Sequence, residues 1–142
     1  MNLLKPAWMQ YAWGEIGTGE FAGSADNPRI VQYHWAVGAG SSGDEVAWCS
    51  SLVNWVFKQV GVERTRSRAA RSWEKWGQEL EEPVYGCVCI LWRESRQSWK
   101  GHVGFWIAED SHRVLLLGGN QGNEVCARWF PKGRVLSYRM PA

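Results

Sequence analysis

At 142 residues the chain is long enough to bury one hydrophobic core, and we expect a single domain spanning residues 1–142. Sixteen lysines and arginines are nearly balanced by fourteen aspartates and glutamates, and this net charge of +2 argues against a dedicated nucleic-acid-binding protein. We therefore expect no nucleic-acid partner. No apolar run approaches the ~20 residues of a membrane-spanning helix, so we also expect no stable membrane insertion.

The first third of the chain carries signals for two helices. The segment PAWMQYAWGEIG has apolar residues at helical spacing and stops at Gly17. A loop rich in glycine and serine follows. Asn27 followed by Pro28 is typical of a helix start, with an N-cap side chain and a proline in the first turn. We predict a second helix from Pro28 to about Val37.

A third helix is predicted within DEVAWCSSLVNWVFKQVG, residues 44–61. Asp44 is a candidate N-cap, and Gly61 is a natural C-terminal stop. Five apolar residues follow the period of 3.6 that marks one face of a helix. They are Trp48, Leu52, Trp55, Val56 and Val60.

The second half changes from helix to strand. SRAARSWEKWGQEL predicts one more helix, with Ala69, Trp73 and Trp76 on one side. After Pro83, the runs GCVCILW, HVGFWIAED, RVLLLGG and RVLSYRM predict short strands, and EDSHR predicts a hairpin turn between the second and third of them. Helices followed by antiparallel strands indicate an α+β fold, with N-terminal helices packed on a C-terminal sheet.

Cys49 is predicted to lie in the first turn of the third helix. The unpaired N–H groups and the dipole of a helix N-terminus stabilise a thiolate, which is the nucleophilic form of cysteine. Because most helical cysteines are packing residues, the assignment of a nucleophile depends on a partner that can transfer its proton.

Three histidines compete for this role. His34 lies inside the second predicted helix and His112 lies in a turn, where we expect a packed or solvated side chain. His102 opens a predicted strand directly after Gly101, where it can face the N-terminus of a helix packed on the sheet. We therefore predict that His102 is the base.

A catalytic imidazole also needs a polar group that fixes its tautomer. The run RVLLLGGNQGN ends beside the start of the His102 strand if the two strands are antiparallel neighbours. Its paired glycines allow a close approach of the backbone. Asn120 is our first choice for the orienting residue, and Gln121 is the second and a candidate substrate contact.

The remaining cysteines and most of the eleven tryptophans are assigned to the core. Cys87, Cys89 and Cys126 lack the spacing of a zinc site, and we expect neither a metal nor a disulfide. Trp48, beside the nucleophile, and Trp73 are candidate substrate contacts in a cleft wall, although a core position fits either equally well. The arginines of ERTRSRAAR predict a solvated basic face or a contact with an anionic wall polymer.

Several segments together resemble a known group of enzymes. They are NPRIVQYH, DEVAWCSSLVNW, ARSWEKWG, EPVYGCVCIL, GHVGFW, LLLGGNQGN and GRVLSYRMP. These segments cover nearly the whole chain and resemble a family of small phage and prophage proteins related to CHAP and NlpC/P60 cysteine peptidases and cell-wall lysins. The resemblance implies a papain-like fold, with the cysteine of WCS, Cys49, as nucleophile. It also implies that the histidine of GHVGF, His102, and the polar residue of GGNQG, Asn120, complete the site.

Two positions depart from that pattern. CHAP enzymes often carry a glutamate two residues before their asparagine, and here that position is Gly118. A strand that often begins Gly-Asp in these families begins Gly86–Cys87 here. The triad is therefore expected to rest on Asn120 alone.

The resemblance implies acyl transfer to water without a cofactor. His102 would take the proton of Cys49, the thiolate would attack an amide carbonyl, and the backbone N–H of Cys49 would stabilise the oxyanion. The implied substrate is peptidoglycan, cut by an amidase or an endopeptidase of the endolysin type, and we expect a monomer.

Other functions remain open. The same residues suit an injected antibacterial effector, or a toxin that transfers acyl groups on proteins, and the fold alone suits a non-catalytic phage structural or wall-binding module. MNLLKPAWMQYAWGEIG is a poor secretory signal. We therefore expect synthesis in the cytoplasm and action on the wall after release through a holin or after injection.

Overall fold

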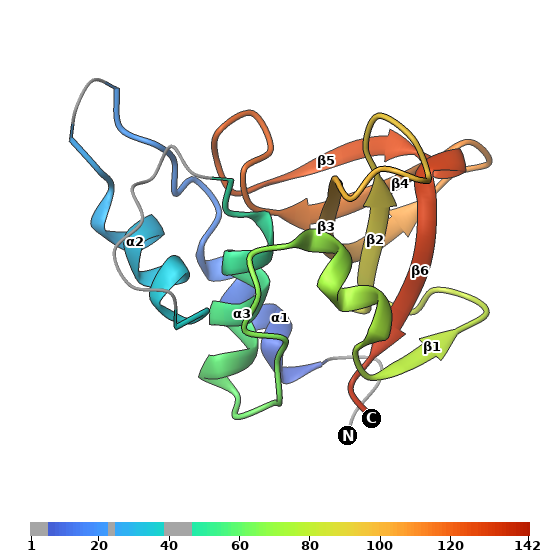
Figure 1. The fold of residues 1–142 in the computed structure, drawn as a ribbon, viewed down its shortest axis with the longest axis horizontal. Coiled ribbons are helices and arrows are strands. Elements are labelled where there is room, and N and C mark those ends of the chain that lie inside the picture. The colour runs from blue at the N-terminus through green and yellow to red at the C-terminus, as the bar shows by residue number, and fades with distance from the viewer. Residues whose placement is uncertain (1–5, 23–24, 39–46) are drawn as a thin grey trace.

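The computed structural model describes residues 6–22, 25–38 and 47–142, and within them three α-helices lie to one side of a six-stranded sheet (Figure 1). The helices are α1 (Ala7–Gly14), α2 (Pro28–Trp35) and α3 (Cys49–Gln59). The strands are β1 (Gln78–Leu80), β2 (Val88–Trp92), β3 (Gly101–Glu109), β4 (Arg113–Gly118), β5 (Cys126–Pro131) and β6 (Val135–Met140). Two short 3₁₀ helices, η1 (Ala70–Lys75) and η2 (Lys132–Arg134), complete the described elements.

The sheet is antiparallel and has the order β1-β6-β2-β3-β4-β5. The predicted α+β layout is confirmed, as are the four predicted strands and the hairpin that joins β3 to β4. The two strands that we did not predict, β1 and β5, lie at the edges of the sheet. Their side chains are mostly exposed, so the sequence lacks the alternation of apolar residues that marks a half-buried strand.

The predicted helix starts and stops are partly confirmed. The side chain of Asn27 accepts a hydrogen bond of 2.9 Å from the backbone N–H of Arg29, as expected of an N-cap. Gly61, just after α3, has a φ of 68°, a left-handed conformation that suits glycine. The residue at the N-cap position of α3 is Trp48, whose side chain makes no capping hydrogen bond. Asp44 lies outside the described residues.

The predicted helix over SRAARSWEKWGQEL is wrong. The segment forms only the 3₁₀ helix η1 and then strand β1. Trp76 is already extended, and Gly77 has a φ of 62° and lies so close to the carbonyl of Met140 that no side chain fits there. Pairing of β1 with β6 therefore ends the helix. The backbone groups on this edge of β6 find their hydrogen-bond partners in β1, and a longer helix would leave them unpaired.

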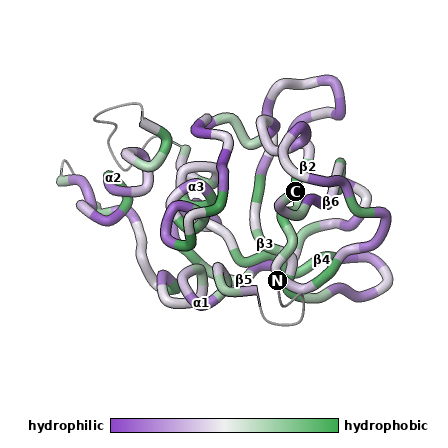
Figure 2. Tube along the Cα trace, turned by 90° about the horizontal axis from the view of Figure 1, so that it is seen from below, coloured by the Kyte–Doolittle hydropathy of each residue, from purple (hydrophilic) through white to green (hydrophobic). Residues whose placement is uncertain are grey.

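The main core lies between the helices and the sheet, where α3 packs against β3. Val88 and Ile90 of β2 face this core, whereas Cys89 and Leu91 face a smaller cluster on the other side of the sheet. The hydropathy colouring shows apolar segments along the strands and polar segments in the loops (Figure 2). Within the described residues, no helix is both long and apolar enough to cross a membrane.

Candidate active site

Cys49 is the first residue of α3 and is 8% exposed at the floor of a cleft of about 500 Å³. Trp48 leaves the first turn without a side-chain cap. The N–H groups at this end of the helix are therefore available to the sulfur and to a bound substrate. The backbone N–H groups of Ser50 and Val103 favour the ionised form of the Cys49 sulfur.

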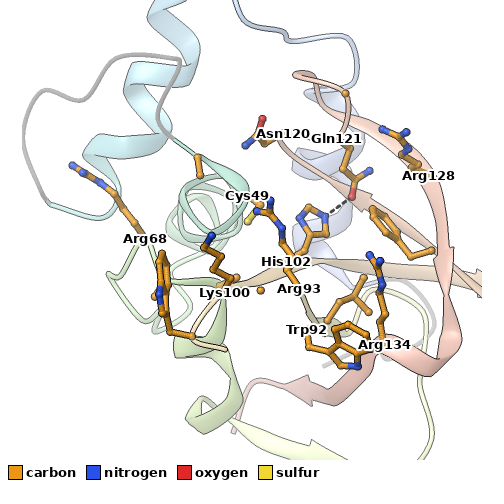
Figure 3. A pocket seen from close by; sticks show the side chains of 18 of the residues that line it. Cys49, Arg68, Trp92, Arg93, Lys100, His102, Asn120, Gln121, Arg128 and Arg134 are labelled. Atoms are coloured by element: carbon orange, nitrogen blue, oxygen red, sulfur yellow. Dashed lines mark hydrogen bonds between the residues drawn. The ribbon is translucent and has the colours of Figure 1, made fainter. Parts of the chain in front are cut away.

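His102 lies between Cys49 and Gln121 (Figure 3). Its Nε2 is 2.9 Å from Oε1 of Gln121. The amide nitrogen of Gln121 donates to the backbone oxygens of Leu116 at 3.2 Å and Cys126 at 2.7 Å, which fixes the orientation of the amide. Oε1 therefore accepts a hydrogen bond from Nε2–H, and Nδ1 is left as the nitrogen that can exchange a proton with Cys49.

The pKa of the Cys49 thiol is lowered. Burial opposes ionisation, but the hydrogen bond and the charge of His102 favour the thiolate more strongly, and the two backbone N–H donors add to this effect. The shift thus favours the thiolate, the form that a nucleophile requires.

The pKa of His102 is raised. Burial disfavours the imidazolium, but the hydrogen bond and charge of Cys49, with the hydrogen bond to Gln121, favour it more strongly, while the charge of Arg93 opposes it. The opposite shifts of Cys49 and His102 both favour a thiolate–imidazolium pair, which is the form of an activated cysteine.

The side chain that accepts the hydrogen bond from His102 belongs to Gln121 and not to Asn120, our first choice. Asn120 lines the cleft and has a φ of 57°, which turns the chain so that the next side chain reaches the imidazole. The paired glycines are required for this turn. A Cβ on Gly118 would lie 2.5 Å from Oε1 of Gln121, and a Cβ on Gly119 would lie 2.6 Å from the Trp48 ring.

Replacing Gln121 with alanine should lower kcat by on the order of 10²-fold, because an imidazole free to rotate loses its alignment with Cys49. Asn120→Gly is the matched control, since glycine tolerates the positive φ and removes only the side chain. We expect that variant to keep most of the turnover. A larger loss in Asn120→Gly than in Gln121→Ala, with both variants folded by circular dichroism, would restore Asn120 as the orienting residue.

The tryptophans that we proposed as substrate contacts do not line the cleft. Trp48 and Trp73 are fully buried, and the Trp73 indole N–H donates to the Ser50 hydroxyl at 2.9 Å. Trp92 and Trp99 line the cleft instead, and Trp99 is 77% exposed. Trp92 reaches the cleft because it pairs with Gly101 of β3, directly beside His102. Trp99 lies in the loop that joins these two strands. The position of Trp99 three residues before the histidine was the signal we did not use.

The arginines of ERTRSRAAR do not form one face. Arg64 donates to the carbonyl of Ala36 at 3.0 Å, and only Arg68 lines the cleft. The guanidinium of Arg71 donates to the backbone oxygens of Ser95, Arg96 and Lys100 at 2.8 to 3.0 Å. These hydrogen bonds stabilise the conformation of the β2–β3 loop. The loop leads directly into β3, the strand that carries His102.

The other three thiols do not take part in the site: Cys87 and Cys89 are buried, and Cys126 does not line the cleft. Burial raises the pKa of Cys87 to about 12 and raises that of Cys89 as well, in keeping with the packing role we predicted. Cys126 is partly exposed, and its thiol donates to the backbone oxygen of Gln121 at 3.3 Å. All four cysteines are free, and the described residues hold no cluster of three potential metal ligands.

His34 and His112 lie where the sequence placed them. His34 is fully buried with Nδ1 2.8 Å from the Ser51 hydroxyl, and His112 is exposed in the β3–β4 turn. Neither lines the cleft.

Comparison with solved structures supports the fold. No family model and no curated protein matches the chain. A solved structure from Staphylococcus aureus subsp. aureus Mu50, described as similar to a lipoprotein of the NLP/P60 family, superposes with a TM-score of 0.52 at 16% sequence identity. The fold is of the NlpC/P60 type. The match covers 95% of this chain but 40% of that one, so the chain spans less than half the length of this structural relative.

Proposed function

We propose that the chain is a peptidoglycan hydrolase, an amidase or endopeptidase with Cys49 as nucleophile, His102 as acid and base, and Gln121 as the residue that orients His102. The observation that carries the proposal is the Cys49–His102 pair at a helix N-terminus, open to a cleft, in which each group shifts the pKa of the other toward its charged form. The NlpC/P60 fold supports a wall substrate.

The geometry supports an acyl-transfer mechanism. The Cys49 thiolate attacks an amide carbonyl, and the backbone N–H of Cys49 at the uncapped start of α3 stabilises the oxyanion. The imidazolium of His102 then gives its proton to the leaving amine, which breaks the C–N bond and leaves a thioester on Cys49. Neutral His102 next removes a proton from water, which attacks the thioester and regenerates the thiolate.

The lysin role and the site of action belong to this proposal. We propose that residues 1–142 form one catalytic domain that works as a monomer on the cell wall, reaching it after phage-type release or injection. The cleft rim with the exposed Trp99 ring suits a glycan-bearing peptide, since aromatic rings stack on sugars.

Digestion of purified sacculi followed by mass spectrometry tests the function. An endopeptidase releases fragments with a new amino terminus within the stem peptide, whereas an amidase releases whole stem peptides free of sugar. A folded protein that leaves sacculi from both thick- and thin-walled bacteria uncut would contradict the proposal and favour acyl transfer on a protein target.

A further inference from the structure

The cleft wall is strongly cationic in an otherwise balanced chain. Its described lining residues include five lysine or arginine side chains and no carboxylate. The five are Arg68, Arg93, Lys100, Arg128 and Arg134. With 16 basic and 14 acidic residues in the whole chain, this segregation of charge is local to the cleft.

Several cations outside the cleft have carboxylate partners. Arg29, Arg113 and Lys132 each lie within 3.2 Å of a carboxylate oxygen. In the cleft, Lys100 pairs with Glu94 at 2.7 Å, and Arg134 lies over the Trp92 ring at 5.4 Å.

Arg93 and Arg128 differ from these cations. No ion pair joins either of them to a carboxylate of the described residues. Several like charges in one cleft repel one another, and a bound anion relieves that repulsion.

These two arginines flank the catalytic residues. Arg93 directly follows β2, and its positive charge acts to lower the pKa of His102. Arg128 lies on β5, where its Nη1 is 3.3 Å from the position that a Cβ on Gly122 would take, so it borders the loop that carries Gln121. The two guanidinium groups therefore lie on different sides of the imidazole (Figure 3).

We infer that the cleft selects a peptide acyl donor with free carboxylates next to the amide that is cut, and that Arg93 and Arg128 are the residues that bind them. The choice of carboxylate follows from the site, because the attacked group is an amide and the anions of a peptide are carboxylates. Guanidinium groups bind carboxylates through two parallel hydrogen bonds. This inference rests on the proposed function for the attack by Cys49 on an amide.

The charge of the cleft can be tested without any turnover. Iodoacetate and iodoacetamide alkylate the same thiolate, but only iodoacetate is an anion, so the ratio of their rates at Cys49 reports the local potential. The rates are read from the mass of the Cys49 peptide. We expect Arg93→Gln and Arg128→Gln to lower this ratio by roughly threefold to tenfold each. Arg113→Gln, which is paired with Asp110 and does not line the cleft, is the control and should leave it unchanged. Equal ratios in all four proteins would overturn the inference.

Ligand protection then tests the carboxylates directly. Soluble disaccharide-peptides, with free carboxylates or with the same groups chemically amidated, are added before iodoacetamide. We expect the free form to protect Cys49 at a concentration at least tenfold lower than the amidated form, with this preference lost in Arg93→Gln. Equal protection by both forms, or protection by glycerol phosphate oligomers alone, would overturn the assignment. Protection without cleavage would instead count against the hydrolase and leave the binding preference standing.

Discussion

Cys49→Ala should reduce the release of peptide fragments from sacculi by about 10⁴-fold or more, to the background of the assay. The substitution removes the group that forms the covalent intermediate, and neither the oxyanion donor nor substrate binding replaces it. The fold should survive, because Cys49 is one small side chain at the edge of the core, facing the cleft. Fragment release is followed by mass spectrometry at matched protein concentration.

Cys89→Ala is the matched control for this experiment. It deletes a thiol from β2 that faces the smaller apolar cluster on the other side of the sheet and does not line the cleft. We expect a loss of stability from the cavity but retained turnover per folded molecule. If Cys49→Ala kept turnover close to that of the unmodified protein, Cys49 would not be the nucleophile.

The second large effect is expected for His102→Ala, which should lower kcat by about 10⁴-fold near neutral pH. Two losses combine: the thiolate is no longer stabilised by an imidazolium, and the leaving amine no longer receives a proton. Part of the first loss should be recovered at alkaline pH, where Cys49 ionises without help. The measurement is the rate of fragment release as a function of pH.

His112→Ala provides the comparison. His112 is an exposed histidine of the β3–β4 turn, outside the cleft, and its loss should leave kcat within about twofold. Equal effects of the two substitutions would remove His102 from the mechanism.

The sequence was informative where function depends on the ends of regular elements. Cys49 opens α3, and His102 is the second residue of β3, as their positions in the sequence predicted. The antiparallel pairing of β3 with β4 brings the GGNQG turn to His102, which was also expected. These features depend on local periodicity and on the order of the strands, both of which a single sequence records.

The third residue of the site could not be chosen from the sequence. Asn120 and Gln121 are adjacent, and which one reaches the imidazole depends on the left-handed turn at Asn120 and on the two carbonyls that hold the Gln121 amide. The space for that amide exists because Gly118 has no side chain. Such details belong to tertiary packing.

The charge of the cleft was missed for a similar reason. Its five cations come from separate parts of the chain: the segment before η1, the β2–β3 loop, β5 and η2. The basic run ERTRSRAAR supplies just Arg68, while Arg71 of the same run holds a loop in place. Trp48 was wrongly considered for the cleft because proximity to the nucleophile in the sequence does not indicate where a ring will point, and the Trp73 ring is likewise buried in the core.

The ionised Cys49–His102 pair is most directly tested by the pH dependence of Cys49 alkylation. Iodoacetamide is added from about pH 4 to about pH 9, and the Cys49 peptide is quantified by mass spectrometry. Because the pKa of Cys49 is lowered by His102, the rate should rise at a pH below that of a free thiol, and His102→Ala should move this rise to higher pH. A rise at the pH of a free thiol, unchanged in His102→Ala, would contradict the pair and the mechanism built on it.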